Sequence, residues 1–507
     1  LEPFYKKFPE ISLRDTPHSV YGISLKKEDV SHLDLSIFYQ LEEVDASGFS
    51  EFTADLFNEL PLENIKKLSL QGIDVTEFDF SRLTSLEEID LSGARDLTAD
   101  VFNRLPLENI KKLSLQGIDV TGFDFSRLIS LKEINLSMAR RLTADLFHSL
   151  PLENIEKLCL WGEYTDVTGF KFSRLHSLRE LRLGSVKNLT AEQFNGLSKK
   201  NIEKLELSGC DINVAGFNFR ELSSLRDFKV GYVVGFDVKE FNSLPKKNIE
   251  KLNWIDINVA RFDFVEFSSL KNLTLNSVKG LNAREFNSIP KEGIEKIDLW
   301  NITGNVPEYE FSSFFSLKEL LLIGIKDFTA SQFNSLPKEN LKKVNLAQDN
   351  VTGFDFSKLT SLEEIDLGNV KDLTAEQFNR LPKEKLKKIY LRSVNVAEFD
   401  FSGFLSLEEI DLDGAIGLTA DQFDRLPKEN LKKINLRGVD VEGFDFSRLT
   451  SLREIDLSDS RGFASWRFNS LLKENLKMIC LGYADVTGFD LSGFSLSRKY
   501  VGLYFRT

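Results

Sequence analysis

Apolar and polar residues alternate in short segments that recur along almost the whole chain. Each segment has the form LxxLxL, with apolar residues at positions 1, 4 and 6, as in LEEIDL from Leu86 and IKKLSL from Ile110. The period-2 alternation at positions 4 and 6 predicts a short strand that turns those side chains toward a core. Two repeats take turns along the sequence, one of 24 residues (86–109) and one of 21 residues (110–130).

The remainder of each repeat predicts a different kind of element. In the longer repeat, LTADVFNRLP places Thr98 as an N-cap, Asp100 in the first turn and Pro106 after the last turn of a short helix. The shorter repeat has no room for that helix. Its GFDFSRL segment, with Phe123 and Phe125 two residues apart, predicts an extended or 3₁₀ segment instead.

A phenylalanine falls at the same place in every pair of repeats. Its ten positions are Phe57, Phe102, Phe147, Phe194, Phe241, Phe286, Phe333, Phe378, Phe423 and Phe468. Successive members lie 45 to 47 residues apart, and a fixed period of this kind predicts a solenoid whose units bury their apolar faces against one another. We expect the stacked rings to form a buried spine, because burying each side chain stabilises the fold by roughly 1.5–3 kcal/mol.

These repeats resemble the leucine-rich-repeat family, and the resemblance covers residues 20–507. It implies an α/β repeat solenoid, a horseshoe or arc, with a parallel sheet on the concave side and short helices or 3₁₀ turns on the convex side. The longer repeat is most similar to the cysteine-containing subtype, without its cysteines. The family's usual asparagine at position 9 is replaced by apolar residues such as Ala94, Ile118 and Val186. We therefore expect the loop amides to bond to backbone or water.

The repeat boundaries divide the chain into three parts. Residues 1–19 are expected to form an N-terminal cap segment, residues 20–495 about 21 repeats, and residues 496–507 a degenerate last repeat or C-terminal cap. Nothing resembling a flexible linker interrupts the period, so one elongated domain is expected.

Position 3 alternates in charge from repeat to repeat, with Asn272 and Met478 as exceptions. The ladder includes Glu88, Lys112, Glu133, Lys157, Glu364 and Lys388. Adjacent parallel strands are about 4.8 Å apart, so each lysine is expected to lie between two carboxylates. We interpret the ladder as structural, because a slip of one repeat would bring like charges together. The lysines are then already neutralised, which argues against a nucleic-acid groove.

Composition excludes several kinds of function. The net charge is −13 with no basic block, which disfavours nucleic acid and anionic membranes as partners. No apolar run is long enough to span a membrane. The three cysteines are far apart, the four histidines are scattered, and no phosphate-binding loop or HExxH motif occurs. We therefore expect no enzyme activity, no metal and no cofactor.

Location remains open at this point. The chain begins with Leu1 rather than Met, as after processing or at a fragment boundary, which slightly favours an extracellular over a cytoplasmic protein. The five N-x-S/T sequons do not decide the question; they are Asn135, Asn188, Asn272, Asn301 and Asn350.

Recognition of a protein partner is the function that a long concave face favours. Position 7 is mostly small or polar and becomes apolar at a few repeats near the middle of the chain. The predicted partner-binding residues are Trp161, Tyr232, Ile255, Trp300, Leu321 and Ile323. Trp300 and Ile323 belong to neighbouring repeats, so the patch is expected to centre on them, with the aromatic ring that interface hot spots favour.

Two other functions fit the same repeats. The regular units, the alternating charges and the C-terminal RKYVGLYFRT also suit a structural or coat protein that stacks end to end, since an uncovered terminal strand invites pairing. A third interpretation is the substrate-binding arm of a ubiquitin-ligase receptor, which the subtype of the longer repeat suggests. That function requires an adaptor-binding segment, and residues 1–19 show none that we recognise.

Overall fold

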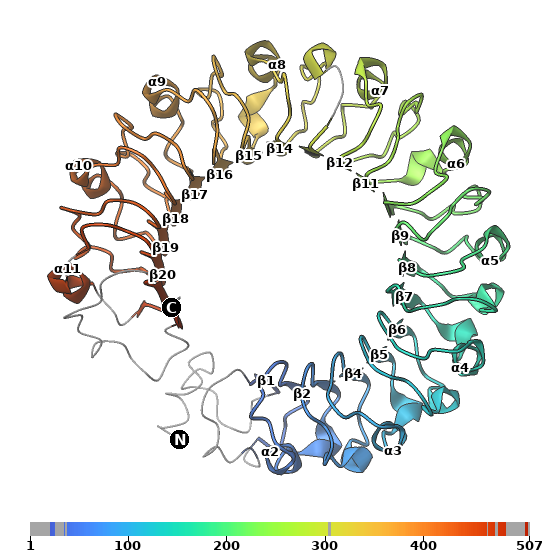
Figure 1. The fold of residues 1–507 in the computed structure, drawn as a ribbon. Helices are drawn as coiled ribbons and strands as arrows, with labels where there is room; N and C mark the ends of the chain where they lie inside the picture. The colour runs from blue at the N-terminus through green and yellow to red at the C-terminus, as the bar shows by residue number, and fades with distance from the viewer. Residues whose placement is uncertain are drawn as a thin grey trace. The chain divides into compact units, whose positions relative to one another are not determined.

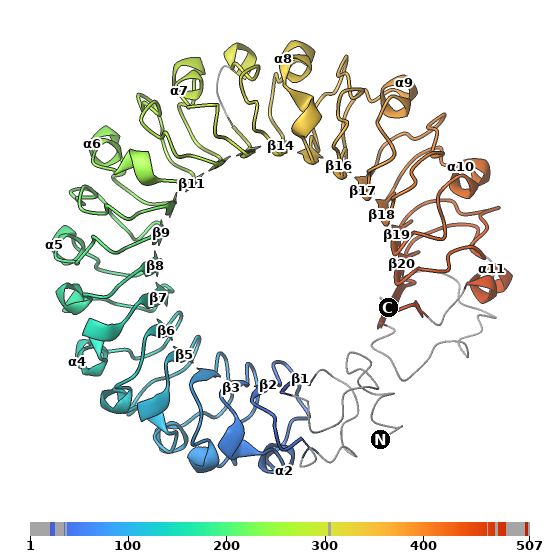
Figure 2. The same ribbon diagram turned by 180° about the vertical axis from the view of Figure 1, so that it is seen from behind.

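The structure is a computed structural model that describes residues 21–25, 35, 38–302, 306–463, 465–471, 475–482 and 502–504. Its chain divides into two compact units, Leu1–Asn253 and Trp254–Thr507. The predicted N-terminal cap, 1–19, lies outside the described residues, as does most of 496–507. Within each unit the strands line one side and the helices lie on the other, as Figure 1 and, from behind, Figure 2 show.

Each repeat contributes one short strand. In the first unit these are β1 (Gly22–Ser24), β2 (Glu43–Asp45), β3 (Lys67–Ser69), β4 (Glu88–Asp90), β5 (Lys112–Ser114), β6 (Glu133–Asn135), β7 (Lys157–Trp161), β8 (Glu180–Gly184), β9 (Lys204–Ser208) and β10 (Asp227–Gly231). The next strand, β11 (Lys251–Ile255), contains the boundary between the units. The second unit continues with β12 (Asn272–Asn276), β13 (Lys296–Trp300), β14 (Glu319–Ile323), β15 (Lys343–Asn345), β16 (Glu364–Asp366), β17 (Lys388–Tyr390), β18 (Glu409–Asp411), β19 (Lys433–Asn435), β20 (Glu454–Asp456), β21 (Met478–Cys480) and β22 (Gly502–Tyr504).

Within each unit, consecutive strands pair in parallel and keep the same repeat positions side by side. Glu88 lies opposite Lys112, and Lys112 opposite Glu133. The second unit repeats this register, with Glu364 opposite Lys388. The strands from β7 to β14 are five residues long, whereas those on either side are three. The strands from β7 to β14 therefore extend to position 7, and most of the candidate binding residues lie on them.

The longer repeats carry one short helix each on the side away from the strands. The helices are α2 (Ala54–Asn58), α3 (Ala99–Phe102), α4 (Ala144–Ser149), α5 (Ala191–Asn195), α6 (Val238–Asn242), α7 (Ala283–Asn287), α8 (Ala330–Ser335), α9 (Ala375–Asn379), α10 (Ala420–Asp424) and α11 (Ser465–Ser470). The predicted cap is confirmed, because the Thr98 hydroxyl accepts a hydrogen bond from the Val101 amide of α3.

Single 3₁₀ turns supply the remaining regular structure. Their ranges are Leu62–Asn64, Phe80–Arg82, Leu107–Asn109, Phe125–Arg127, Leu152–Asn154, Phe172–Arg174, Lys246–Asn248, Val306–Glu308 and Lys338–Asn340. Five of them follow a proline of the LP sequence in the longer repeat, and three cover the FSR sequence of the shorter one. The expectation of a 3₁₀ segment around Phe125 is thus confirmed.

The phenylalanine spine is buried as predicted. Every ring of the series from Phe57 to Phe423 is inaccessible to solvent, whereas the side chain of Phe468 lies outside the described part of the structure. In eight of the described repeat pairs the helical ring stacks on the first aromatic ring of the following shorter repeat: Phe102 and Phe123, for example, lie 4.1 Å apart at 9°. Aromatic pairs of this kind add to the burial energy and link each longer repeat to the next shorter one. The predicted α/β repeat solenoid is confirmed.

The loop amides at position 9 bond to backbone carbonyls as expected, for example from Ala94 to Leu91 at 3.0 Å. On the helical side, asparagine side chains also bond neighbouring repeats together. The Asn103 side chain donates to the Gly122 carbonyl at 3.2 Å and accepts from the Asp124 amide at 2.9 Å. The same pair of bonds is made by Asn195, Asn287, Asn334 and Asn379. A second row, at the end of the longer repeat, bonds backward: Asn109 donates to the Thr84 carbonyl at 3.2 Å. The asparagine row that the family has at position 9 is absent, and these two asparagine rows bond the repeats on the helical side instead.

Candidate binding surfaces on the strand side

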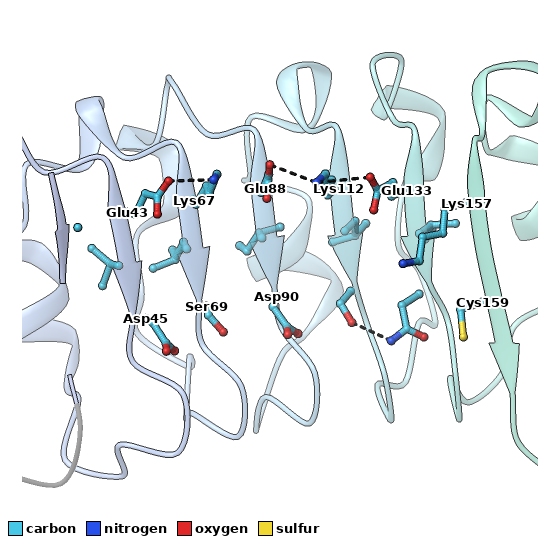
Figure 3. A pocket seen from close by; sticks show the side chains of 18 of the residues that line it. Glu43, Asp45, Lys67, Ser69, Glu88, Asp90, Lys112, Glu133, Lys157 and Cys159 are labelled. Carbon is cyan, nitrogen blue, oxygen red and sulfur yellow. Dashed lines mark hydrogen bonds and ion pairs between the residues drawn. The ribbon is translucent and has the colours of Figure 1, made fainter. Parts of the chain in front are cut away.

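The strand side of the first unit is hollowed between β1 and β8. The hollow has a volume of about 790 Å³ and is lined by positions 3, 4 and 5 of successive strands, from Gly22 to Arg182. Figure 3 shows two parallel rows of polar side chains crossing it, one of long charged residues and one of short polar ones. The apolar position-4 side chains between them, such as Ile89, are buried.

The charged row is the predicted ladder. Lys112 lies between Glu88 and Glu133, with its Nζ 3.6 and 3.4 Å from their carboxylate oxygens (Figure 3). Attraction by Glu133 and then by Glu88 raises the pKa of Lys112. Lys157 pairs onward with Glu180 at 3.5 Å.

The second unit has the same arrangement. There Lys343 pairs with Glu364 at 2.7 Å, and Lys388 with Glu409 at 3.3 Å. All of these side chains are partly exposed, so each pair contributes only a little to stability, about 0.2–1 kcal/mol.

The second row, at position 5, is made of short hydrogen-bonding side chains. Asp90 accepts from the Ser92 amide at 2.8 Å, and Asn135 donates to the Ser114 hydroxyl at 3.2 Å. Cys159 continues the row (Figure 3), and burial raises the pKa of its thiol. A raised pKa keeps the sulfur protonated, which is the opposite of what a nucleophilic cysteine requires. This row can offer hydrogen bonds to a polar partner rather than covalent chemistry.

In the second unit, three of the predicted binding residues come together at the ends of β13 and β14. Trp300 lies directly opposite Ile323, and Leu321 lies on the same strand as Ile323, two residues earlier. Trp300 is 52% exposed, and the other two side chains are half-buried. Ile255 ends β11 and is separated from this cluster by Asn276, which ends β12 opposite Trp300. The cluster is therefore apolar at its centre and has a polar neighbour on one side.

The two predicted residues of the first unit are placed differently. Trp161 ends β7 and lies against Gly184 of β8, so its ring is partly covered by its own chain. Tyr232 follows β10 in a turn with a φ of 56°, and its side chain is 52% exposed. Two strands, β8 and β9, separate these residues, so the structure does not bring Trp161 and Tyr232 together.

Sequence reasoning missed Asp349, which lies beside the Trp300 cluster. Its carboxylate accepts from the Ile325 amide at 2.8 Å, just beyond the end of β14, while its second oxygen is buried without a partner. Burial raises the pKa of Asp349 to about 8. The available signal was its position, because other shorter repeats place apolar residues such as Ile118 and Val394 there.

Two further properties concern the described residues alone. Among them, no group of three or more histidine, cysteine, aspartate or glutamate side chains is arranged to hold a metal ion. None of their helices combines the length and the apolar character needed to cross a bilayer.

One parallel strand per repeat, a short helix or turn on the other side and a buried core between them define a leucine-rich-repeat solenoid. No protein-family model matches this chain, and no curated protein matches it either. Among solved structures, the functional domain of InlJ from Listeria monocytogenes, which includes a cysteine ladder, is 14% identical, with a TM-score of 0.43 over 66% of this chain and 71% of that one. TLR13 in its complex with ssRNA13 is 17% identical, with a TM-score of 0.47 over 87% of this chain and 78% of that one. Both TM-scores lie below 0.5, so the fold assignment rests on this chain's own strands and repeats.

Proposed function

We propose that the chain is a non-catalytic recognition scaffold that binds a protein partner on the strand side of its second unit. Trp300 is the central anchor, and Ile323 and Leu321 extend its apolar surface. The observation that supports this proposal most is the exposure of Trp300, of which 52% is open to solvent although it ends a regular strand.

The energetics of this arrangement favour binding. A large aromatic side chain on a hydrogen-bonded strand has few conformations to lose, so it can bury much apolar area in a complex at small entropic cost. Pairing with Ile323 fixes the position of the strand end that carries the ring. Trp161 occupies the same repeat position, but its ring lies against Gly184 and is partly covered.

The polar surroundings fit the same function. Asn276 lies beside Trp300 on the neighbouring strand, and Asp298 lies opposite Leu321. Burial raises the pKa of Asp298, so this carboxyl is less readily ionised than an exposed one and the centre of the patch carries less charge. An apolar centre with polar groups around it is the usual anatomy of a protein interface.

The proposal is tested with Trp300→Asp, which places a charge in the centre of the patch. We expect this variant to lose a partner that the unchanged chain retains in affinity capture, with a melting temperature within about 1–2 °C because the ring is exposed. Phe315→Asp is the matched control, since Phe315 is an exposed aromatic residue of the same repeat, 62% open to solvent, but lies outside the strand. Equal retention by Trp300→Asp and the unchanged chain would contradict the proposal.

Self-association is the competing function. Light scattering on the purified chain across a hundredfold range of concentration distinguishes the two, because recognition requires discrete particles and end-to-end stacking produces growing polymers. A mass that rises steadily with concentration and is unaffected by Trp300→Asp would favour the structural protein.

A further inference from the structure

A second charged row runs along the edge of the strands, at position 2 of each repeat. In the first unit it alternates in sign except at the adjacent Lys111 and Lys132, and its members pair with one another. Lys66 contacts Glu42 at 2.8 Å, and Lys111 contacts Glu87 at the same distance. This row is distinct from the position-3 ladder, because its members precede the strands and lie at their N-terminal ends.

Two adjacent cations also occur at Lys111 and Lys132 and at Lys318 and Lys342, but each of these four lysines pairs with a glutamate. The end of the second unit differs. Three successive repeats place a cation at position 2, namely Lys432, Arg453 and Lys477. Backbone hydrogen bonds show that they are neighbours: the Arg453 amide donates to the Lys432 carbonyl at 2.8 Å, and the Lys477 amide to the Arg453 carbonyl at 2.7 Å.

The three cations are not equally neutralised. Lys432 pairs with Glu408 at 2.8 Å. Arg453 and Lys477 are exposed, and neither forms an ion pair in the part of the chain that the structure describes. At a separation of about 5 Å, two like charges in water repel by about 0.8 kcal/mol. The chain keeps this repulsive pair although its net charge is −13, so the edge is complementary to an anion.

We propose that Lys432, Arg453 and Lys477 form a docking edge for an acidic helix of a partner protein. The spacing selects the helix. Strands follow one another every 4.8 Å or so, and an α-helix with one carboxylate per turn repeats about every 5.4 Å. Over two steps the difference is about 1.2 Å, which the flexible lysine and arginine side chains absorb. Carboxylates on one face of an extended peptide lie about 6.6–6.8 Å apart, so they match the spacing of the three cations less well than those of a helix.

This edge is separate from the Trp300 cluster and does not depend on the function proposed for it. The edge residues precede β19, β20 and β21, whereas Trp300 ends β13. A variant at one surface therefore leaves the other surface as its own control.

The test uses two alanine-based helical peptides of identical composition. One carries three glutamates on a single face, at positions i, i+4 and i+7, and the other distributes them around the helix. Fluorescence anisotropy measures their binding to the full chain at 50 mM salt, where screening is weak. The Arg453→Glu, Lys477→Glu double variant removes the edge, and Lys371→Glu, Lys385→Glu is the matched control, because both of these lysines are exposed and unpaired in the same unit.

We expect the single-face peptide to bind the unchanged chain at least fivefold more tightly than the other peptide. The edge variant should weaken this binding at least tenfold, and the control by less than twofold. No binding at 50 mM salt, equal binding of the two peptides, or an equal loss in the control variant would each overturn the proposal. The last result would reveal a general charge effect instead of a docking edge.

Discussion

The ring of Trp161 lies directly against the backbone of Gly184 on the neighbouring strand. A Cβ atom at Gly184 would come within 2.3 Å of the Trp161 ring, which leaves no space for any side chain. Trp300 and Trp161 occupy the same repeat position, but their neighbours on the next strand differ. Trp161 lies opposite Gly184, which leaves space for its ring, whereas Trp300 lies opposite the larger Ile323 and is more exposed.

Gly184→Ala should therefore force Trp161 to move. We expect either a loss of about 1–3 kcal/mol in stability from overpacking or a red shift of tryptophan emission as the ring swings into solvent. Thermal denaturation and fluorescence measure the two outcomes. In a Trp161→Ala background the same substitution should have almost no effect, because the clash is gone. A Gly184→Ala variant with unchanged melting temperature and unchanged emission would show that the ring does not rest on this glycine.

The charge ladder predicts that reversing the charge of Lys112 destabilises the fold more than removing that charge. Lys112→Ala removes attraction to Glu88 and Glu133, whereas Lys112→Glu adds repulsion between three adjacent carboxylates. The melting temperature should fall further for Lys112→Glu, by an amount that corresponds to roughly 0.2–1 kcal/mol for each neighbour. The difference between the variants should shrink in 1 M salt. Lys385→Glu, at an exposed and unpaired position, provides the control. Equal melting temperatures for the two Lys112 variants would contradict a ladder that maintains register.

The buried carboxyl of Asp349 should make stability fall as pH rises. Its folded-state pKa of about 8 lies above the usual value of 3.8, because the carboxyl is buried. Its stabilising contribution is therefore complete below about pH 4 and is lost progressively up to about pH 8, by about 1.4 kcal/mol per pH unit.

Asp349→Asn cannot ionise but still accepts from the Ile325 amide. Its melting temperature should exceed that of the unchanged chain by a margin that grows between pH 5 and pH 8 and then stays constant. Asp327→Asn, at an exposed position nearby, should show no such trend. A margin that does not vary with pH would show that Asp349 has no unusual titration.

His148 should make the first unit sensitive to acid. Its Nε2 accepts from the Lys171 amide at 3.0 Å, in the place where Asn103 accepts from Asp124. Burial, then the charges of Lys171 and Arg174, lowers the pKa of His148. The unfolded chain therefore binds this proton more readily, and the associated stability is complete above about pH 6.5 and is lost as pH falls through the folded-state pKa.

His148→Asn restores the bonding group of the other repeats and removes the titration. The difference in melting temperature between pH 7.5 and pH 5 should be smaller in this variant, by the equivalent of about 1 kcal/mol for one unsatisfied amide. His176→Asn, at an exposed site, should behave like the unchanged chain. If both variants respond to acid as the unchanged chain does, His148 is not the sensitive group.

The fold was largely predictable because it depends on period alone. Aligning the repeats places Glu88 beside Lys112 and stacks Phe102 on its neighbours, and the structure has both arrangements. The candidate site was predictable only in part. Trp300 and Ile323 are neighbours as expected, since strand pairing follows the repeat.

Other features depend on packing and local backbone geometry, which a period does not specify. The rotamer of Trp161 decides whether its ring points into solvent or packs against Gly184. Tyr232 leaves the sheet because position 8 turns the chain with a positive φ, 56° at Tyr232 and 59° at Gly93, and the apolar pattern alone does not show this turn. The role of Asp349 likewise depends on where one turn amide points.

The two asparagine rows constrain how such a chain can grow or shrink. The Asn103 side chain bonds to backbone groups of the next repeat, and the Asn109 side chain bonds to a backbone carbonyl of the preceding repeat; each repeat is one coil of the solenoid. Deleting a single coil would leave one of these amides facing a mismatched neighbour and would break the alternation of the aromatic stack. Viable changes in length should therefore come in pairs of coils, which makes duplication of the pair the natural step by which an array of this kind lengthens.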